Sequence, residues 1–376
     1  MDAVRRQRPV PPEGLRADHA PAPERRPARR ALHPRGHAVL AAAVLPRRPA
    51  RLVAAVPHVQ TPRGALAGRP RPRQADRHRH RRRGRPARQP LRVPLPPGRI
   101  GDLPPVTISS WQAAGRHLTI GGRRIFVVDR GTGAPVVFVH GFPGSSYDWR
   151  SVLPPGRRVI ALDLLGFGLS DKPSSDRYSL VSQADLVWSV LKELGVGSCT
   201  LVGHDIGDTV IAELLHRSFP ADRVVLLNGS IFSDLVSLSL GQKLLLALPD
   251  RRLPVGVPGP VLRASLRATF AMPPTAALIA EMESLIRLQR GDRLLTRQIR
   301  YVLERRRNQL TWTRALLDYP GRLDLLWGER DPIAVPAMAH RLRSLRPETS
   351  VTLWSDVGHW PALEAPERVL AALASS

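Results

Sequence analysis

Aromatic residues are confined to one part of this chain, which limits where a hydrophobic core can form. All 18 Phe, Tyr and Trp residues lie beyond residue 100 of the 376, and Ile100 is the only isoleucine before that point. Residues 1–100 also hold 25 arginines, five acidic residues and 18 of the 38 prolines, giving a net charge of +20. So few large side chains cannot offset the entropy of ordering the segment. We predict a disordered Arg- and Pro-rich extension over residues 1–107 and one folded domain over residues 108–376.

The net charge of +26 belongs mostly to this extension, since the rest of the chain carries only +6. Its densest basic run, at residues 77–83, would attract phosphate and predicts salt-dependent nucleic-acid binding that is lost when the extension is deleted. However, no aromatic side chain is interleaved to stack on bases. The composition therefore favours a plain extension over a nucleic-acid-binding one.

Cysteine and hydropathy patterns restrict the compartment. The single Cys199 excludes an intrachain disulfide and a multi-cysteine metal site, and its apolar neighbours indicate an inert core thiol. No apolar run reaches the roughly 18 residues of a membrane-spanning helix. The run at residues 38–45 has only signal-peptide length and lacks a clear cleavage site. We expect a cytoplasmic protein without a membrane partner.

From Trp111 onward, short β-rich runs alternate with helical patterns, which is typical of a mostly parallel sheet with crossover helices. Eight strands are predicted, at residues 116–120, 123–129, 136–140, 158–163, 198–202, 223–227, 323–327 and 350–354. Flanking helices are predicted at residues 182–194, 208–218, 335–345 and 366–374.

One connection, of some 90 residues, is too long for a crossover. Apolar spacings of three and four predict helices at residues 237–248, 275–288 and 292–317. We interpret residues 231–321, approximately, as a helical cap inserted over the carboxyl ends of the strands, where active sites of open α/β sheets lie.

The chemistry-bearing motif is GHDIG at residues 203–207, which follows a predicted strand and opens a helix. This is the form of a nucleophile elbow with Asp205 at its centre. Asp331 and His359 each follow a later strand, so the chain order is nucleophile, acid, histidine. The backbone N–H groups of Phe142 and Ile206 are the candidate oxyanion-hole donors.

The chain resembles the aspartate-nucleophile branch of the α/β-hydrolase superfamily, which contains epoxide hydrolases and haloalkane dehalogenases. HGFP at 140–143, GFGLSDKP at 166–173 and GHDIG carry the resemblance. Within the branch, FPGSSYDW at 142–149, VIALDLLGFG at 159–168 and HDIGD at 204–208 resemble the mesoderm-specific transcript protein-like hydrolases.

The resemblance implies an α/β-hydrolase fold and a two-step reaction on a small-molecule substrate. Asp205 would form an alkyl ester, and His359, oriented by Asp331, would activate water to hydrolyse it. The scheme needs neither a metal nor an organic cofactor.

Departures from the family pattern bear on the substrate. Ile206 stands where dehalogenases place Trp or Arg, which disfavours halide release. Epoxide hydrolases use two cap tyrosines as acids, whereas this cap offers Tyr301 as the candidate, with Trp312-Thr313 where the family often has Trp-Tyr. Epoxide hydrolysis is therefore the favoured reaction, and dehalogenation or another hydrolysis is the alternative. Outside the enzymes, the alternative is a non-catalytic protein of the same fold that binds a ligand.

Other polar residues receive structural interpretations. Asp163 and Ser170 are predicted to organise a turn, and His204 to pack beneath the elbow. Asn228 occupies a position where some relatives carry the acid, but only Asp331 bears the required charge. The run of arginines at residues 305–307 is interpreted as a solvated helix face.

Overall fold

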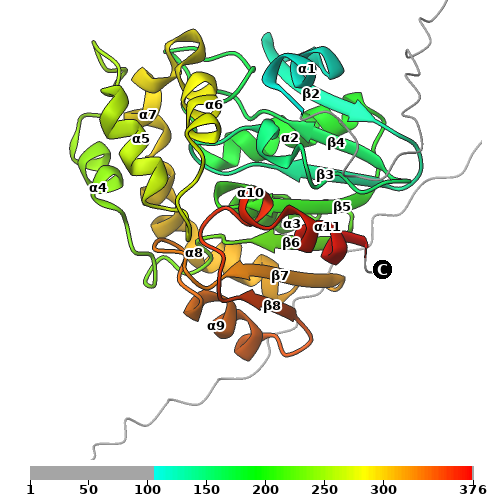
Figure 1. Cartoon of the computed structure of the whole chain (residues 1–376). Coiled ribbons are helices and arrows are strands. Elements are labelled where there is room, and N and C mark those ends of the chain that lie inside the picture. The colour runs from blue at the N-terminus through cyan, green and yellow to red at the C-terminus, as the bar shows by residue number, and fades with distance from the viewer. Residues whose placement is uncertain (1–105, 375–376) are drawn as a thin grey trace, which may run out of the picture. The chain divides into compact units, whose positions relative to one another are not determined.

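The computed structural model describes residues 106–374, in which a central sheet is flanked by helices (Figure 1). The predicted extension, including the basic run at 77–83, lies outside the described residues except for its last two. Those two join the folded part: Tyr147 donates a hydrogen bond to the Val106 carbonyl over 2.7 Å. Thr107 caps helix α1 (Ile108–Ala114) through its hydroxyl. Residues 106 and 107, which the prediction placed in the extension, therefore belong to the folded part.

The eight predicted strands form one sheet of order β1-β2-β4-β3-β5-β6-β7-β8. Their bounds are β1 Arg116–Ile120, β2 Arg123–Arg130, β3 Pro135–Val139, β4 Arg158–Leu162, β5 Cys199–His204, β6 Ala221–Leu227, β7 Arg322–Gly328 and β8 Ser350–Trp354. β1 and β2 form an antiparallel hairpin around Gly121 and Gly122, and β2 also pairs antiparallel with β4. All other pairings are parallel, so the sheet is mixed and mostly parallel, as predicted.

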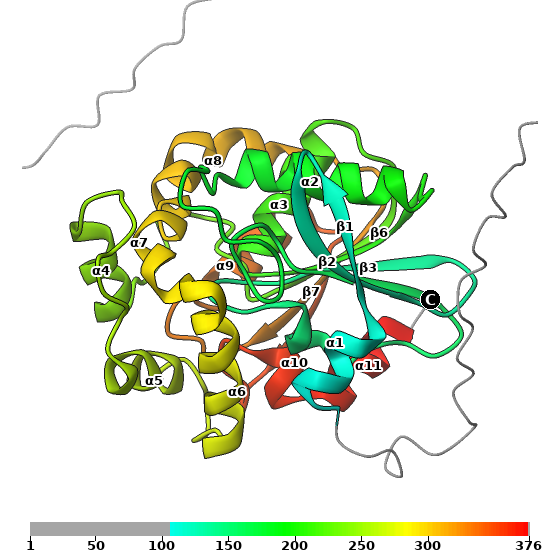
Figure 2. The ribbon, with the colours of Figure 1, turned by 90° about the horizontal axis from the view of Figure 1, so that it is seen from above.

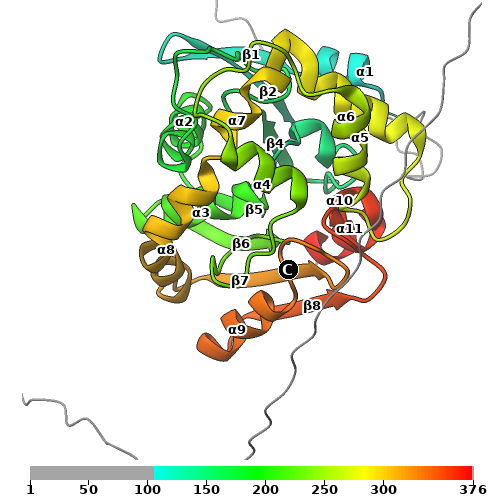
Figure 3. The ribbon, with the colours of Figure 1, turned by 90° about the vertical axis from the view of Figure 1, so that its left-hand side faces the viewer.

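Helices cover both faces of the sheet (Figures 2 and 3). On one face lie α2 (Leu180–Glu193), α3 (Ile206–His216) and α9 (Ala337–Leu345); on the other lie α1, α10 (Pro361–Glu364) and α11 (Pro366–Ala374). Side chains of β3 alternate between the two cores, because successive residues of a strand point to opposite faces. Cys199 is fully buried, and burial raises the pKa of its thiol to about 12, in agreement with an inert core residue.

The turn after β4 is organised as the sequence predicts. The Asp163 carboxylate accepts hydrogen bonds of 2.6 Å from the backbone N–H groups of Ser146 and Leu169. The Ser170 hydroxyl donates to the Asp163 carbonyl and accepts from the Phe126 N–H. Ser146 belongs to a short 3₁₀ helix, η2 (Ser146–Trp149), that follows β3. These bonds fix the loops that border the site.

The 90-residue connection between β6 and β7 is helical, as predicted (Figure 1). Its elements are α4 Leu240–Ala247, α5 Gly259–Arg267, α6 Ala276–Arg287, η3 Leu288–Leu294, α7 Leu295–Gln298 and α8 Tyr301–Leu317. The prediction of one helix over residues 292–317 is wrong, because the helical path is divided among η3, α7 and α8. Gln289 and Arg290 adopt positive φ just before this stretch, so α6 does not continue into it either.

This helical segment contacts loops that follow the carboxyl ends of the strands. The Gln298 side chain donates to the Gly166 carbonyl after β4, over 2.6 Å. The Thr269 carbonyl accepts from the His359 backbone N–H after β8, over 2.9 Å. We call residues 240–317 the cap segment below.

Candidate active site

Asp205 lies in a strained turn between β5 and α3. Its φ is +49°, a conformation that non-glycine residues rarely adopt. The glycines on either side are required by space: a Cβ at Gly207 would lie 2.1 Å from the Val139 carbonyl oxygen, and one at Gly203 would lie 2.6 Å from Asp208. The side chain of Asp205 is thereby held at the N-terminus of α3, where the helix dipole favours negative charge.

One predicted oxyanion donor contacts the Asp205 carboxylate directly. The Phe142 N–H, just beyond β3, donates to Asp205 Oδ2 over 3.0 Å. Ile206 begins α3, so its N–H is among the first-turn donors that have no partner within the helix. Phe142 is brought close by Gly141, where a Cβ would lie 2.6 Å from the His204 ring.

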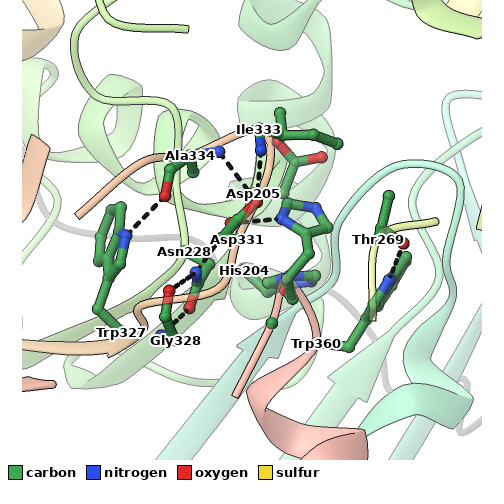
Figure 4. Close-up of polar contacts among 12 residues, drawn as sticks. His204, Asp205, Asn228, Thr269, Trp327, Gly328, Asp331, Ile333, Ala334 and Trp360 are labelled. Carbon is green, nitrogen blue, oxygen red and sulfur yellow. Dashed lines mark hydrogen bonds and ion pairs between the residues drawn. The ribbon is translucent and has the colours of Figure 1, made fainter. Parts of the chain in front are cut away.

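Asp331 and His359 form a buried pair. His359 Nδ1 lies 2.8 Å from Asp331 Oδ2, and both side chains are almost fully excluded from solvent. The other Asp331 oxygen accepts the N–H groups of Ile333 and Ala334, over 2.7 and 3.1 Å (Figure 4). Because the carboxylate only accepts, His359 carries its proton on Nδ1 and keeps the lone pair of Nε2.

The electrostatics of the two buried histidines differ. Burial lowers the pKa of His204 to about 4, assisted by the nearby His359. Its Nε2 donates to the His359 carbonyl over 2.7 Å, which confirms that His204 packs beneath the elbow. Burial also disfavours a charged His359, but the charge and hydrogen bond of Asp331, together with the charge of Asp205, raise its pKa.

Asn228 supports the acid instead of replacing it. Its Nδ2 donates to Asp331 Oδ2 over 2.8 Å, and its Oδ1 accepts the Gly328 N–H over 2.9 Å (Figure 4). Asn228 follows β6 with a φ of +43°, which turns it toward the neighbouring β7 loop. Asn228 and Asp331 therefore meet in one hydrogen-bond network.

Tyr301 begins α8 and lies over the loop that bears Phe142. The ring centroids of these two residues are 5.5 Å apart, and Tyr301 is only 3% exposed. Burial and the charge of Asp205 raise the pKa of its phenol, so it keeps its proton across the neutral range. The cap segment thus packs the candidate acid against Phe142, whose backbone N–H contacts the candidate nucleophile.

Arg305 is the main residue that the sequence interpretation placed wrongly. It is not on a solvated face: its side chain is 5% exposed and pairs with Asp205 Oδ1 through Nη1 at 3.2 Å. Its Nη2 donates to the Asp205 carbonyl over 2.6 Å, and its Nε to the Thr209 hydroxyl over 2.8 Å. Of the three arginines at residues 305–307, only Arg306 and Arg307 are exposed. Tyr301 lies four residues before Arg305 and Trp312 seven after it, which is the signal that could have placed all three on one inward face.

Three further hydrogen bonds fasten α8 to the rest of the fold. The Trp312 indole donates to Glu213 of α3 over 2.6 Å. Glu304 accepts the Leu180 N–H at the start of α2 over 2.7 Å. Gln309 accepts the Ser233 N–H over 2.9 Å. The helix that carries Arg305 is thus held in place from both sides of the site.

A family model described as "Alpha/beta hydrolase family" matches residues 136–372, which include every residue of this site. The chain belongs to the α/β-hydrolase family. The match covers the sheet from β3 onward, the cap segment and the loops after β3, β5, β7 and β8.

Relatives of this α/β hydrolase cover most of its folded part. It is 34% identical to LipZ of Mycobacterium tuberculosis over 278 residues, which cover 69% of this chain and 94% of LipZ. It is 33% identical to the mesoderm-specific transcript protein of Mus musculus over 298 residues, covering 70% and 87%. This bears out the resemblance to α/β hydrolases and to mesoderm-specific transcript protein-like sequences noted above.

The fold is shared with solved structures of the family. The structure of the epoxide hydrolase CorEH superposes with a TM-score of 0.58 at 21% identity, covering 69% of this chain and 96% of CorEH. At that identity, the likeness establishes the fold alone.

Residues 106–374 contain neither a metal-binding cluster nor a membrane-spanning helix. No group of three or more His, Cys, Asp and Glu side chains there is arranged to hold a metal ion. No helix in that range combines the length and the apolar character needed to cross a bilayer.

Proposed function

We propose that this α/β hydrolase opens an epoxide on a small, largely apolar substrate through a covalent ester on Asp205. The observation that carries the proposal is a carboxylate, where a hydroxyl is commoner, at the strained elbow, with one oxygen held by the Phe142 N–H at 3.0 Å. A carboxylate attacking an ordinary ester would form an unstable anhydride, whereas attack on an alkyl carbon gives a stable ester.

In the first step, Asp205 Oδ1 forms a bond to a ring carbon while the bond from that carbon to the epoxide oxygen breaks. The alkoxide takes a proton, for which Tyr301 is the proposed donor. The burial of Tyr301 and its place over Phe142 support this role.

In the second step, His359 Nε2 takes a proton from water as the water oxygen bonds to the Asp205 carboxyl carbon. The resulting oxyanion would be stabilised by the N–H groups of Phe142 and Ile206. Collapse breaks the ester bond, and His359 returns its proton to the departing alkoxide, giving a diol. The second proton of the water is left on the Asp205 carboxyl group, and its transfer to the Tyr301 phenolate restores both residues. The Asp331 carboxylate keeps the imidazole oriented and stabilises its charged form.

Trapping the ester tests this proposal. A His359→Gln variant is incubated with a panel of epoxides, haloalkanes and esters, and the Asp205 peptide is examined by mass spectrometry. We expect an adduct with epoxides, and none in wild type or in a matched His340→Gln control, because His340 is exposed on α9. Adducts with haloalkanes alone would assign the site to dehalogenation. No adduct and no wild-type turnover would favour a ligand-binding protein.

Tyr301 is tested in the same background. Tyr301→Phe should slow adduct formation from epoxides but not from haloalkanes, since a halide leaves without a proton. Equal slowing of both classes would instead indicate a packing role for the ring.

A further inference from the structure

The buried guanidinium of Arg305 loses its negatively charged partner during the proposed two-step reaction. In the free protein, Arg305 and Asp205 form a buried ion pair, with side-chain exposures of 5% and 3%. Formation of the ester neutralises Asp205 and leaves the guanidinium buried without that partner. Removing one member of a buried pair is strongly unfavourable, because the remaining charge stays desolvated.

Arg305 cannot simply follow the lost charge into solvent. Nε is held by the Thr209 hydroxyl, one Nη2 hydrogen is held by the Asp205 carbonyl, and the guanidinium lies 4.7 Å from the Tyr301 ring centroid. None of these contacts involves the Asp205 carboxylate, so all survive its alkylation. The Nη1 and Nη2 groups that face Asp205 Oδ1, at 3.2 and 3.3 Å, would remain directed at the alkyl group bound there.

The nearest candidate to replace the lost charge within the protein is Asp208, one turn along α3. Its carboxylate is packed against glycine: a Cβ at Gly229 would lie 1.9 Å from Asp208 Oδ2. Burial raises the pKa of Asp208 well above its usual range, outweighing the opposite effect of Arg305. Because burial disfavours a charged Asp208, a negative charge carried by the substrate is the better replacement for the one lost from Asp205.

We propose that Arg305 forms a carboxylate-binding subsite, so that the preferred substrate carries a carboxylate next to the carbon that Asp205 attacks. A guanidinium offers parallel N–H donors that match a carboxylate in both charge and geometry. In the ester, the substrate carboxylate takes the place of the Asp205 charge, and the buried site remains neutral overall. This inference rests on the proposed alkyl-ester function and specifies its substrate class.

A small cavity lies beside Arg305, with room for about one water molecule. Its walls include the apolar side chains of Val236, Leu238, Val302 and Ile333, and the exposed Arg306 also lines it. A substrate with an apolar body and an acidic group at one end would have to push these walls apart to place its carboxylate on Arg305.

An Asp205→Asn variant isolates the subsite from the chemistry, because the neutral carboxamide copies the charge state of the ester. Binding of cinnamate and of its uncharged amide, cinnamamide, is measured by calorimetry. We expect Asp205→Asn to bind cinnamate at least about tenfold more tightly than wild type does and more tightly than it binds cinnamamide. Adding Arg305→Gln should abolish both differences, while Arg305→Lys, which keeps the charge but loses the fork, should retain part of the gain.

Equal affinity of Asp205→Asn for cinnamate and cinnamamide would overturn the proposal; an Asp208 that ionises to replace the lost charge would give that result. Thermal unfolding of each variant verifies that it is folded. If the Arg305→Gln variant does not fold, the comparison is made with Arg305→Lys. The two proposals fail separately. A carboxylate-selective Asp205→Asn without any trapped ester would refute the alkyl-ester function alone, and a trapped ester without carboxylate selectivity would refute the Arg305 subsite alone.

Discussion

Replacing Asp331 with Asn should separate the two steps of the proposed reaction. The Asp331 carboxylate accepts four hydrogen bonds: two from the backbone N–H groups of Ile333 and Ala334, one from Asn228 and one from His359. Asparagine has nearly the same shape but turns one acceptor oxygen into a donor. In either orientation, the new NH₂ group would face two donors across about 2.7 to 3.1 Å.

The size of the effect on ester hydrolysis depends on how the protein accommodates an NH₂ group that faces other donors. If the NH₂ group faces His359, the imidazole can move its proton from Nδ1 to Nε2 and accept a hydrogen bond. It then has no lone pair to take a proton from water. Loss of the correct tautomer in such a triad costs roughly 10⁴ in rate, or about 5.5 kcal/mol. Attack by Asp205 does not use the imidazole, so ester formation should change no more than a few-fold.

The assay is a single-turnover time course with enzyme in excess over an epoxide that labels the protein. Samples are quenched, and the labelled fraction is read by intact-protein mass spectrometry. We expect Asp331→Asn to acquire label at nearly the wild-type rate and then to lose it over hours. Asp356→Asn is the matched control, because it makes the same chemical change in an exposed ion pair with Arg368.

A decay of the label within tenfold of the wild-type rate, in a variant shown to be folded by thermal unfolding, would refute the reasoning. Asp331 would then neither set the tautomer of His359 nor stabilise its charge. Slow labelling together with normal decay would also contradict it, because that pattern assigns Asp331 to the first step.

Three further predictions concern pH and stability. Breakdown of the ester should slow as pH falls, because His359 becomes protonated and can no longer act as a base; the charge and hydrogen bond of Asp331, which remain in the ester, raise the pKa of His359 against the effect of its burial. A rate of label decay that stays constant across a pH series would contradict this. Gly207→Ala should destabilise the fold by about 1 to 3 kcal/mol or more, since its Cβ would lie 2.1 Å from a β3 carbonyl oxygen, whereas Gly197→Ala, with open space around it, should leave the thermal midpoint nearly unchanged. Trp312→Phe should lower the free energy of unfolding by about 1 to 3 kcal/mol, because buried Glu213 loses the indole donor; an unchanged urea midpoint would show that the bond contributes nothing.

Much of the fold could be predicted from local sequence, because the signals act over short distances. Hydrophobic runs of strand length bounded by turn residues located all eight strands, with ends that differ by at most a few residues. The glycines of GHDIG marked the tight turn because the backbone there leaves no room for a Cβ. Short helices such as α1 and α5 were not predicted, since so few residues show little periodicity.

The sequence by itself determined the sheet, the strained turn that carries Asp205 and the chain order of Asp205, Asp331 and His359. Tertiary structure alone decided what surrounds them. Asn228 and Asp331 are about a hundred residues apart, and they meet only because β6 and β7 are neighbours in the sheet. Arg305 stands in a run of three arginines whose charges alone do not distinguish it from its solvated neighbours. Its burial against Asp205 comes from α8 packing across α3, and no local pattern of charge can encode a contact made across a hundred residues.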